Sequence, residues 1–240
     1  RHPCGGEGPS ISGYGVALPR IPACAGRTQT SRIRRPLVNE ERNVQNDTGV
    51  ETPKQEILRS DAHTGPCFTL GNRVRRALWG VVYSLFFRPT PRPLHAWRAL
   101  LLRLFGAKVG RGVHIYAKAR VWAPWNLEVG DQTGIADDAN LYTMAKITIG
   151  RRVIVSQGAH LCCGTHDFED PDFPLLAYPI RIGDEAWVAA EAFVGPGVTI
   201  GEGAVVGARS VVTKDLPAWT VCAGHPCRPI RPRQFREPGA

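Results

Sequence analysis

A single histidine interrupts a regular stretch of short apolar residues, and its side chain is the strongest candidate for chemistry. Residues 161–183 read LCCGTHDFEDPDFPLLAYPIRIG, so His166 stands where the apolar pattern stops and an acidic excursion begins. A neutral imidazole titrates in the range needed to take a proton from a hydroxyl group as that hydroxyl attacks an electrophile. The sequence therefore predicts that His166 is a general base.

Acidic residues follow the histidine closely, at positions 167, 169, 170 and 172. One of them, with Asp167 the nearest, could orient the imidazole. The alternative for the other three is a solvated acidic loop.

A second set of chemically suited residues lies near the C-terminus, in the segments VVTKD and CRPIR. Lys214 offers a point cation, and Arg228 and Arg231 offer planar guanidinium groups, all of which suit phosphate. The alternative is a solvated basic tail, because further arginines follow these two. We favour phosphate binding, most firmly for Lys214.

A six-residue repeat must position these groups. An apolar residue followed by glycine recurs at 109–110, 129–130, 149–150, 182–183 and 200–201, and the later sixes read IGDEAW, VAAEAF, VGPGVT, IGEGAV and VGARSV. A period of six with an aliphatic first residue and a small fifth one predicts a parallel β-helix of three-sided coils, with small residues at the corners. Residues 107–232 are expected to form it, and two coils carry a two-residue insertion, at 127–128 and 147–148.

The interval of 33 residues between the third and fourth markers is one coil plus an excursion, which we place at 167–179. Because stacked coils leave no path through the interior, the excursion must project outward and cover something. His166 then lies at the corner where the loop leaves the prism.

Besides a general base, His166 could be a solvent-exposed loop residue without function or a metal ligand. A zinc site of histidines needs three donors aimed at one ion, and the others available are at 114, 160 and 225. His160 and His166 are six residues apart, so they point different ways in a six-residue repeat. No metal is predicted.

The charge of the chain is concentrated before the repeat. Of the formal +9, residues 71–106 contribute seven arginines and no acid, whereas residues 107–240 balance fourteen basic against fourteen acidic residues. Segment 71–106 predicts two short amphipathic helices that cap the prism, with contact to an anionic membrane surface as a further hypothesis. Nucleic acid is not expected, because the arginines interleave with apolar residues.

Composition also bounds the remaining parts of the chain. Residues 1–70 show no sustained apolar period of 2 or 3.6 residues and are expected to be a disordered extension. Residues 233–240 are expected to form a tail. The chain begins with Arg, and its one methionine is Met144, so it is interpreted as a fragment or a loosely assigned start. Seven cysteines without a zinc spacing favour reduced thiols in a cytoplasmic protein, and the longest apolar run is too short to span a bilayer.

Over residues 70–232 the sequence resembles the hexapeptide-repeat acyltransferases. The matching segments include RALWGVVYSLFFRPTPRPLHAWRALLLRLFGAKVGRGVHIY, WAPWNLEVGD, THDFEDPDFPL, GPGVTIGEGAVVGARSVVTKD and AGHPCRPI. Within them it is similar to the colanic acid biosynthesis acetyltransferases and, more distantly, to galactoside and maltose acetyltransferases. The resemblance implies a left-handed parallel β-helix and a homotrimer with sites between neighbouring prisms.

The resemblance also implies the reaction, an acetyl transfer from acetyl-CoA to a sugar hydroxyl in exopolysaccharide assembly with His166 as base. Residues matched to coenzyme contacts are Trp187, Gly195, Ala208, Arg209, Thr213, Lys214, Arg228 and Arg231. The candidate acceptor residues are Tyr142, Thr143 and Asp167, although LYTMAK departs here from the Asn or Asp of related sugar acetyltransferases, and packing is the alternative for Tyr142. The acceptor is a sugar or a lipid-linked saccharide, and a cytoplasmic enzyme at the inner membrane face fits it. Serine or xenobiotic acetylation and a non-enzymatic scaffold are the alternatives.

Overall fold

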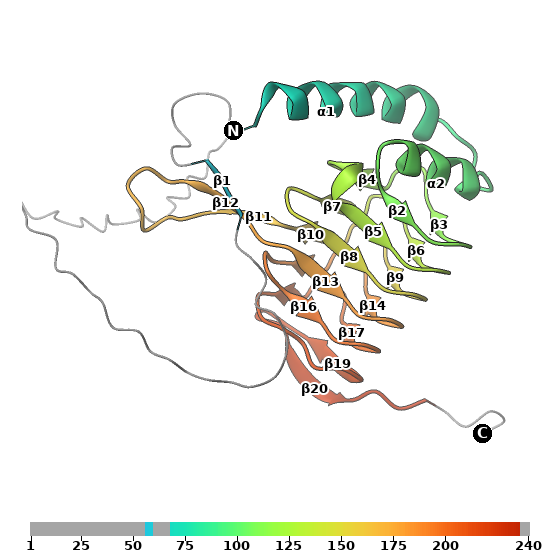
Figure 1. Cartoon of the computed structure of the whole chain (residues 1–240). Helices are drawn as coiled ribbons and strands as arrows, with labels where there is room; N and C mark the ends of the chain where they lie inside the picture. Colours follow the sequence, from blue (N-terminus) through green and yellow to red (C-terminus); the bar gives the residue numbers. More distant parts are fainter. Residues whose placement is uncertain (1–55, 60–67, 236–240) are drawn as a thin grey trace, which may run out of the picture. The chain divides into compact units, whose positions relative to one another are not determined.

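Three sheets, parallel except for the antiparallel last strand β20, form a β-helix that follows a helical arm in the computed structural model (Figure 1), which describes residues 56–59 and 68–235. Each coil of the chain crosses the three sheets in turn, so the coils stack into a three-sided prism. The mainly-β class predicted from the repeat is confirmed. Most of segment 1–70 and residues 236–240 lie outside the described residues.

The three faces of the prism are named by the order in which a coil crosses them. The first face contains β2 (Lys108–Val109), β5 (Leu127–Val129), β8 (Ile147–Ile149), β13 (Ile180–Ile182) and β16 (Thr199–Ile200). The second contains β3 (His114–Ile115), β6 (Gly134–Ile135), β9 (Ile154–Val155), β14 (Trp187–Val188), β17 (Val205–Val206), β19 (Thr220–Ala223) and β20 (Arg228–Pro232). The third contains β4 (Arg120–Val121), β7 (Asn140–Tyr142), β10 (His160–Cys162), β15 (Phe193–Val194) and β18 (Val211–Val212).

The apolar residues that mark the repeat stack directly on one another. On the first face Val109 pairs with Val129, Val129 with Ile149, Ile149 with Ile182, and Ile182 with Ile200. All but the first of these side chains are at most 4% exposed, so each packs on the coil above and below it. Burial of these aliphatic columns is the main favourable contribution to folding.

Within each six, the small fifth residue, predicted at the corner, lies just after it with its side chain inside the prism. Ala186, Ala192 and Ala204 are fully buried. The corner itself falls on the fourth residue, where Glu185 and Glu191 both have φ of 58°. The fifth place is small because its side chain points into the narrow interior just after this turn.

Glycine after each marker lets successive coils approach closely. A Cβ on Gly130 would lie 2.6 Å from the backbone carbon of Gly150. We expect Gly130→Ala to lower the free energy of unfolding by about 1–3 kcal/mol, because the coils must separate to admit the methyl group. Gly134→Ala is the matched control, since a Cβ there meets nothing within 4 Å. Equal denaturant midpoints for the two variants would contradict this account of the stacking.

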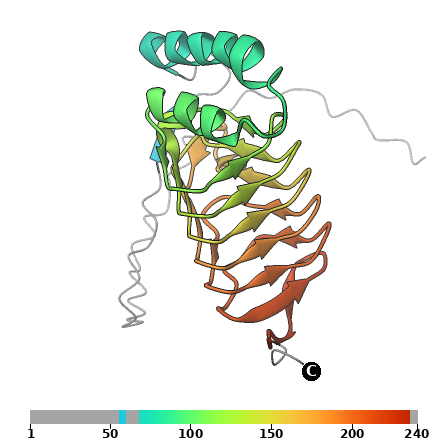
Figure 2. The same ribbon diagram turned by 90° about the vertical axis from the view of Figure 1, so that its right-hand side faces the viewer.

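Two helices cap the first coil (Figures 1 and 2). They are α1 (Leu70–Val82), continued by the π-helical turn η1 (Tyr83–Phe87), and α2 (His95–Leu104). Arg98 is fully buried under the linker between them and donates to the carbonyls of Ile115, Pro91 and Arg92. This guanidinium fixes the linker on the prism without a carboxylate partner among the described residues, and the helices predicted in 71–106 are present.

Candidate functional site

The excursion after the third face is a β-hairpin. β11 (Gly164–His166) and β12 (Leu175–Ala177) pair antiparallel, with His166 opposite Leu175, and β1 (Glu56–Arg59) adds a third strand beside β12. The predicted loop at 167–179 is therefore corrected: the chain leaves the regular coil three residues earlier, at Gly164, and His166 stands on the hairpin and not at the corner of the prism. The hairpin projects from the side of the prism in Figure 1.

The His166 ring is held by one residue of the opposite arm. Its Nδ1 lies 3.1 Å from the carbonyl oxygen of Phe173, and its ring stacks on the Phe173 ring with centroids 4.4 Å apart and planes 14° apart. A carbonyl oxygen only accepts, so Nδ1 carries the hydrogen in the neutral ring. The lone pair is then on Nε2, and that nitrogen can accept a proton from a hydroxyl.

The acidic residues of the hairpin shape its tip and do not orient the imidazole. Asp167 accepts from the Glu169 backbone N–H at 3.1 Å, and Asp170 accepts from that of Asp172 at 2.9 Å. Such side-chain bonds two residues ahead stabilise tight turns. The orienting role predicted for one of these carboxylates belongs to Phe173, which the sequence analysis missed although an aromatic residue seven places after the histidine could have signalled it.

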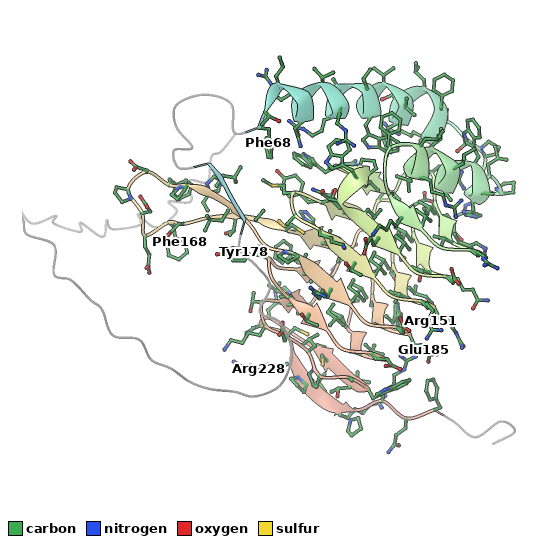
Figure 3. All side chains as sticks on the ribbon, in the orientation of Figure 1. Phe68, Arg151, Phe168, Tyr178, Glu185 and Arg228 are labelled. Atoms are coloured by element: carbon green, nitrogen blue, oxygen red, sulfur yellow. The ribbon has the colours of Figure 1, made fainter. Side chains whose placement is uncertain are left out.

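Removing the Phe173 ring is expected to lower kcat about tenfold while leaving the KM for acetyl-CoA unchanged. In the Phe173→Ala variant the ring that stacks on His166 is absent, so the imidazole samples other orientations. Phe168→Ala is the control, because Phe168 lies on the same hairpin and is 80% exposed (Figure 3). Steady-state kinetics check this, and an unchanged kcat for Phe173→Ala would show that the stacking does not position the base.

The corner between the third and first faces is enlarged in three successive coils. The first enlargement is the 3₁₀ turn η2 (Pro124–Asn126), the second spans residues 143–146, and the third holds the hairpin. Residues 127–128 and 147–148, predicted as insertions, instead pair with each other in β5 and β8. The added length therefore lies before each of these strands, along one edge of the prism.

Thr143 is buried inside this corner. Its side chain is not accessible to solvent, and its hydroxyl accepts from the Ala123 N–H at 2.8 Å and donates to the Ala123 carbonyl at 3.0 Å. The structure therefore does not support the prediction that the Thr143 side chain contacts the acceptor. The side chain is buried, and its hydroxyl is already hydrogen-bonded to Ala123.

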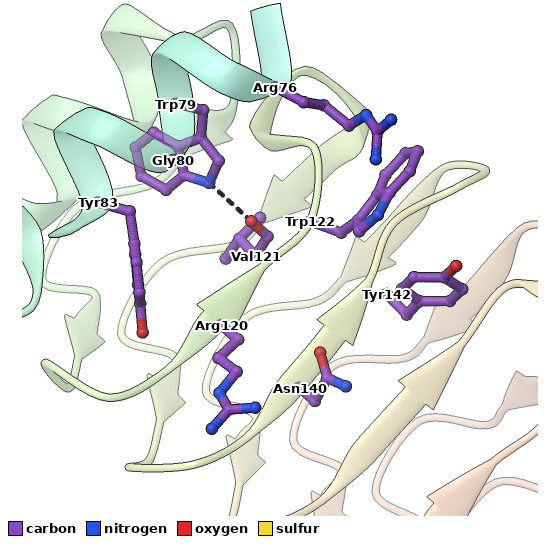
Figure 4. A pocket seen from close by; sticks show the side chains of 9 residues that line it. All are labelled: Arg76, Trp79, Gly80, Tyr83, Arg120, Val121, Trp122, Asn140 and Tyr142. Atoms are coloured by element: carbon purple, nitrogen blue, oxygen red, sulfur yellow. Dashed lines mark hydrogen bonds between the residues drawn. The ribbon is translucent and has the colours of Figure 1, made fainter. Parts of the chain in front are cut away.

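Tyr142, the neighbouring predicted acceptor residue, lines an open cleft between α1 and the third face (Figure 4). The cleft has a volume of about 430 Å³. Trp122 lies edge-on to Tyr142 with ring centroids 5.6 Å apart, and the Arg76 guanidinium lies 4.3 Å above the Trp122 ring. The remaining lining residues are Trp79, Gly80, Tyr83, Arg120, Val121 and Asn140.

α1 is fixed over the cleft by Trp79, whose indole N–H donates to the Val121 carbonyl at 2.7 Å. At the other end the cleft reaches the base of the hairpin, because a Cβ on Gly164 would lie 3.2 Å from the Tyr142 ring. The cleft and the hairpin that carries His166 are thus adjacent. The sequence analysis missed Arg76, Arg120 and Asn140, since nothing in it predicted that α1 would face the third sheet.

The predicted coenzyme residues lie along two different edges of the prism. Gly195, Thr213 and Lys214 follow β15 and β18 at the edge that also carries the hairpin, and Gly195 donates to the Val212 carbonyl at 2.8 Å.

The other group lies on the second face and the edge that follows it. It comprises Trp187, Ala208, Arg209, Arg228 and Arg231. Trp187 is 44% exposed and donates to the Ser156 hydroxyl, and Arg209 is bonded to Glu191 at 2.6 Å. The two edges therefore border the third face on either side of β18, and Trp187, Arg228 and Arg231 lie on the second face.

Histidine packing elsewhere gives no metal centre: within the described residues no three His, Cys, Asp or Glu side chains are grouped to hold an ion. His160 packs between Tyr142 and Phe193 on the third face, and burial lowers the pKa of its imidazole. The neutral form of His160 is favoured there, as expected for a packing residue.

Comparison with known proteins agrees with this architecture. Residues 179–214 match the family described as bacterial transferase hexapeptide (six repeats). The chain is 48% identical over 166 residues to the "Putative colanic acid biosynthesis acetyltransferase WcaF" of Escherichia coli (strain K12), covering 69% of this chain and 91% of that protein.

Two solved structures share the fold. A maltose O-acetyltransferase from Clostridium difficile 630 superimposes with a TM-score of 0.64 at 28% identity, covering 70% of this chain and 90% of that one. A galactoside acetyltransferase in complex with coenzyme A superimposes with a TM-score of 0.64 at 26% identity, covering 70% of this chain and 84% of that one.

A prism of six-residue repeats is the fold of a class of bacterial transferases. Within that class, this chain belongs to the hexapeptide-repeat acetyltransferase family, and it is an acetyltransferase.

Proposed function

We propose that this acetyltransferase moves an acetyl group from acetyl-CoA directly to a saccharide hydroxyl, with His166 as the general base. The observation that carries the proposal is the bond between the His166 Nδ1–H and the Phe173 carbonyl, which leaves the lone pair on Nε2. This nitrogen stands on a hairpin next to an open aromatic cleft. A base and a ring-binding surface side by side suit proton removal from a sugar.

In the proposed step the acceptor hydroxyl attacks the thioester carbonyl carbon while Nε2 of His166 takes the hydroxyl proton. The tetrahedral intermediate then expels the coenzyme A thiolate, which recovers the proton from the imidazolium. Both substrates meet in one cleft, so no acyl-enzyme is required.

The acceptor class follows from the cleft and from the relatives. Trp122 and Tyr142 present ring faces and edges of the kind on which saccharides stack, and Asn140 adds an amide that can donate and accept. The named relatives act in colanic acid biosynthesis or on galactosides and maltose. We therefore place a saccharide of exopolysaccharide assembly, free or lipid-linked, in the cleft and favour it over serine or a xenobiotic.

A homotrimer would unite the two groups of coenzyme residues. Neighbouring prisms related by a threefold axis bring the edge that carries His166 and Lys214 of one subunit against the second face of the next. The pantetheine arm would then pass Gly195 and Ala208, where small residues leave room, and the phosphates would meet Lys214, Arg228 and Arg231. The four cysteines of the described part are free thiols, which fits the cytoplasm, where acetyl-CoA is available.

Two measurements test the function. Calorimetric titration with acetyl-CoA is expected to give saturable binding, and mass spectrometry of products is expected to find acetylated saccharide in a panel that also contains serine and a hydroxylated antibiotic. Acetylation of serine or the antibiotic alone would reject the saccharide assignment, and absence of coenzyme binding would reject the mechanism.

A further inference from the structure

Helix α1 carries two apolar ridges, and only one of them is packed. Trp79 and Phe87 are buried against the prism. The other ridge recurs at spacings of three and four residues on the opposite side of the helix, and its side chains are exposed. Its members are between 49% and 72% exposed: Leu70, Val74, Leu78, Val81 and Leu85. A surface helix normally buries its apolar stripe, so this second ridge indicates a partner.

Helix α2 extends the same apolar surface. Trp97, Leu100 and Leu104 are exposed by 40%, 43% and 72%, and the Trp97 indole donates to the Phe86 carbonyl at 2.8 Å. That bond ties α2 to the end of η1, where Phe86 is itself 52% exposed. Figure 2 shows both helices stacked at the N-terminal end of the prism, remote from β20. We call the exposed apolar side chains of residues 70–104 the arm surface.

The charged residues of the arm itself are all arginines, although Arg98 is buried and Arg92 pairs with Asp137 of the prism at 3.9 Å. Residues 68–106 contain seven arginines and no aspartate or glutamate. Arg73 and Arg75 precede and follow Val74, so helix geometry places them on the two sides of the ridge. Arg73 forms no ion pair among the described residues, and Arg75 stacks over Trp125 at 4.2 Å. Long arginine side chains beside an apolar ridge can reach the headgroup layer while the ridge enters it.

We infer that the arm surface rests on a bilayer containing anionic lipid, with the prism standing away from it. Burial of the apolar side chains at the acyl boundary favours association, and so does attraction of the arginines to the negative surface potential of the membrane. A second copy of this chain suits the surface less, because it would bring its own exposed arginines against those of the first copy, and residues 68–106 hold no acidic residue to pair with them. Residues 1–70 suit it less as well, since they carry nine basic and seven acidic residues and no apolar period.

The association would be peripheral. No helix among the described residues is long and apolar enough to cross a bilayer. Because α1 also roofs the cleft, a protein lying on its arm surface holds the cleft beside the lipid headgroups. If the proposed function holds, an acceptor carried on a lipid would reach His166 without leaving the membrane.

The test is sedimentation with vesicles, which does not depend on catalysis. The full chain is expected to pellet with vesicles of about 30% phosphatidylglycerol in phosphatidylcholine at low salt and to be released at about 0.5 M salt. Pure phosphatidylcholine is expected to leave most of it in the supernatant. The double variant Leu78→Glu with Leu85→Glu is expected to reduce the pelleted fraction about tenfold, because carboxylates then stand in the ridge.

Ile230→Glu is the matched control, since Ile230 is 65% exposed on β20 at the far end of the prism and should leave vesicle binding unchanged. Circular dichroism melts verify that each variant is folded. Equal pelleting of the double variant and the unmodified chain would overturn the inference. A smaller species for the double variant in size-exclusion chromatography, without vesicles, would also overturn it by showing that the arm surface is a protein interface.

Discussion

Replacing His166 with alanine is expected to lower kcat by about 10³-fold, because general base catalysis contributes on that order. The described part of the chain places only this imidazole on the hairpin, with its Nε2 lone pair available. Acetyl-CoA binding should survive, since the predicted coenzyme contacts lie in other elements. Calorimetry on the variant would give an affinity within about threefold of the unmodified protein.

Two variants make this result interpretable. His166→Gln can still donate an amide hydrogen toward the Phe173 carbonyl but cannot take up a proton, so it is expected to be as inactive as His166→Ala. His160→Gln is the control for losing a histidine nearby, because His160 packs on the third face. A kcat for His166→Gln near that of the unmodified enzyme would show that His166 is not the base. A large loss of kcat in His160→Gln alone would show that the base is His160 and not His166.

The second large effect is recovery of activity on mixing two inactive chains. Ala208 is exposed on a turn, so Ala208→Trp should fold normally while its indole fills the proposed path of the pantetheine arm. Each of the two variants alone, His166→Ala or Ala208→Trp, is expected to be inactive as the proposed homotrimer. If a site takes His166 from one subunit and Ala208 from the next, random hybrid trimers contain about one quarter intact sites.

Refolding the two variants together from denaturant at equal amounts would give this mixture, and initial rates would report it. Recovery near one quarter of the activity of refolded unmodified enzyme supports a shared site. A mixture as inactive as its components would show that His166 and Ala208 act within one subunit, and the proposed groove would then be wrong. The two pure variants, refolded alone, control for activity created by the refolding itself.

The repeat was predictable because a β-helix is built by translation. Each aliphatic marker packs on the equivalent residue one coil away, so a six-residue period in the sequence is already a statement about packing, and Ile149 stacking on Ile182 across the hairpin follows from it. Seven arginines without an acid in segment 71–106 likewise indicated a distinct capping element.

Errors arose where the period breaks. Thr143 was given to the acceptor because it stands where related sugar acetyltransferases carry an Asn or Asp, but the enlarged corner turns Thr143 into the interior, where it bonds to Ala123. The excursion was placed at Asp167, yet antiparallel pairing of β11 with β12 begins at Gly164. Neither outcome is encoded by spacing, because a corner of altered length has no repeat to fix its phase.

By itself, then, the sequence determined the prism, the order of its coils, the presence of an excursion and His166 as the candidate base. Only the tertiary structure decided that Phe173 holds that ring, that α1 roofs an open cleft lined by Tyr142, and that the predicted coenzyme residues divide between two edges. The physical reason is that equivalent residues stack at a fixed separation along the chain, so their contacts can be predicted from the period of the sequence. The contacts of Phe173, of Trp79 with Val121, and of one edge with another join segments that no period relates.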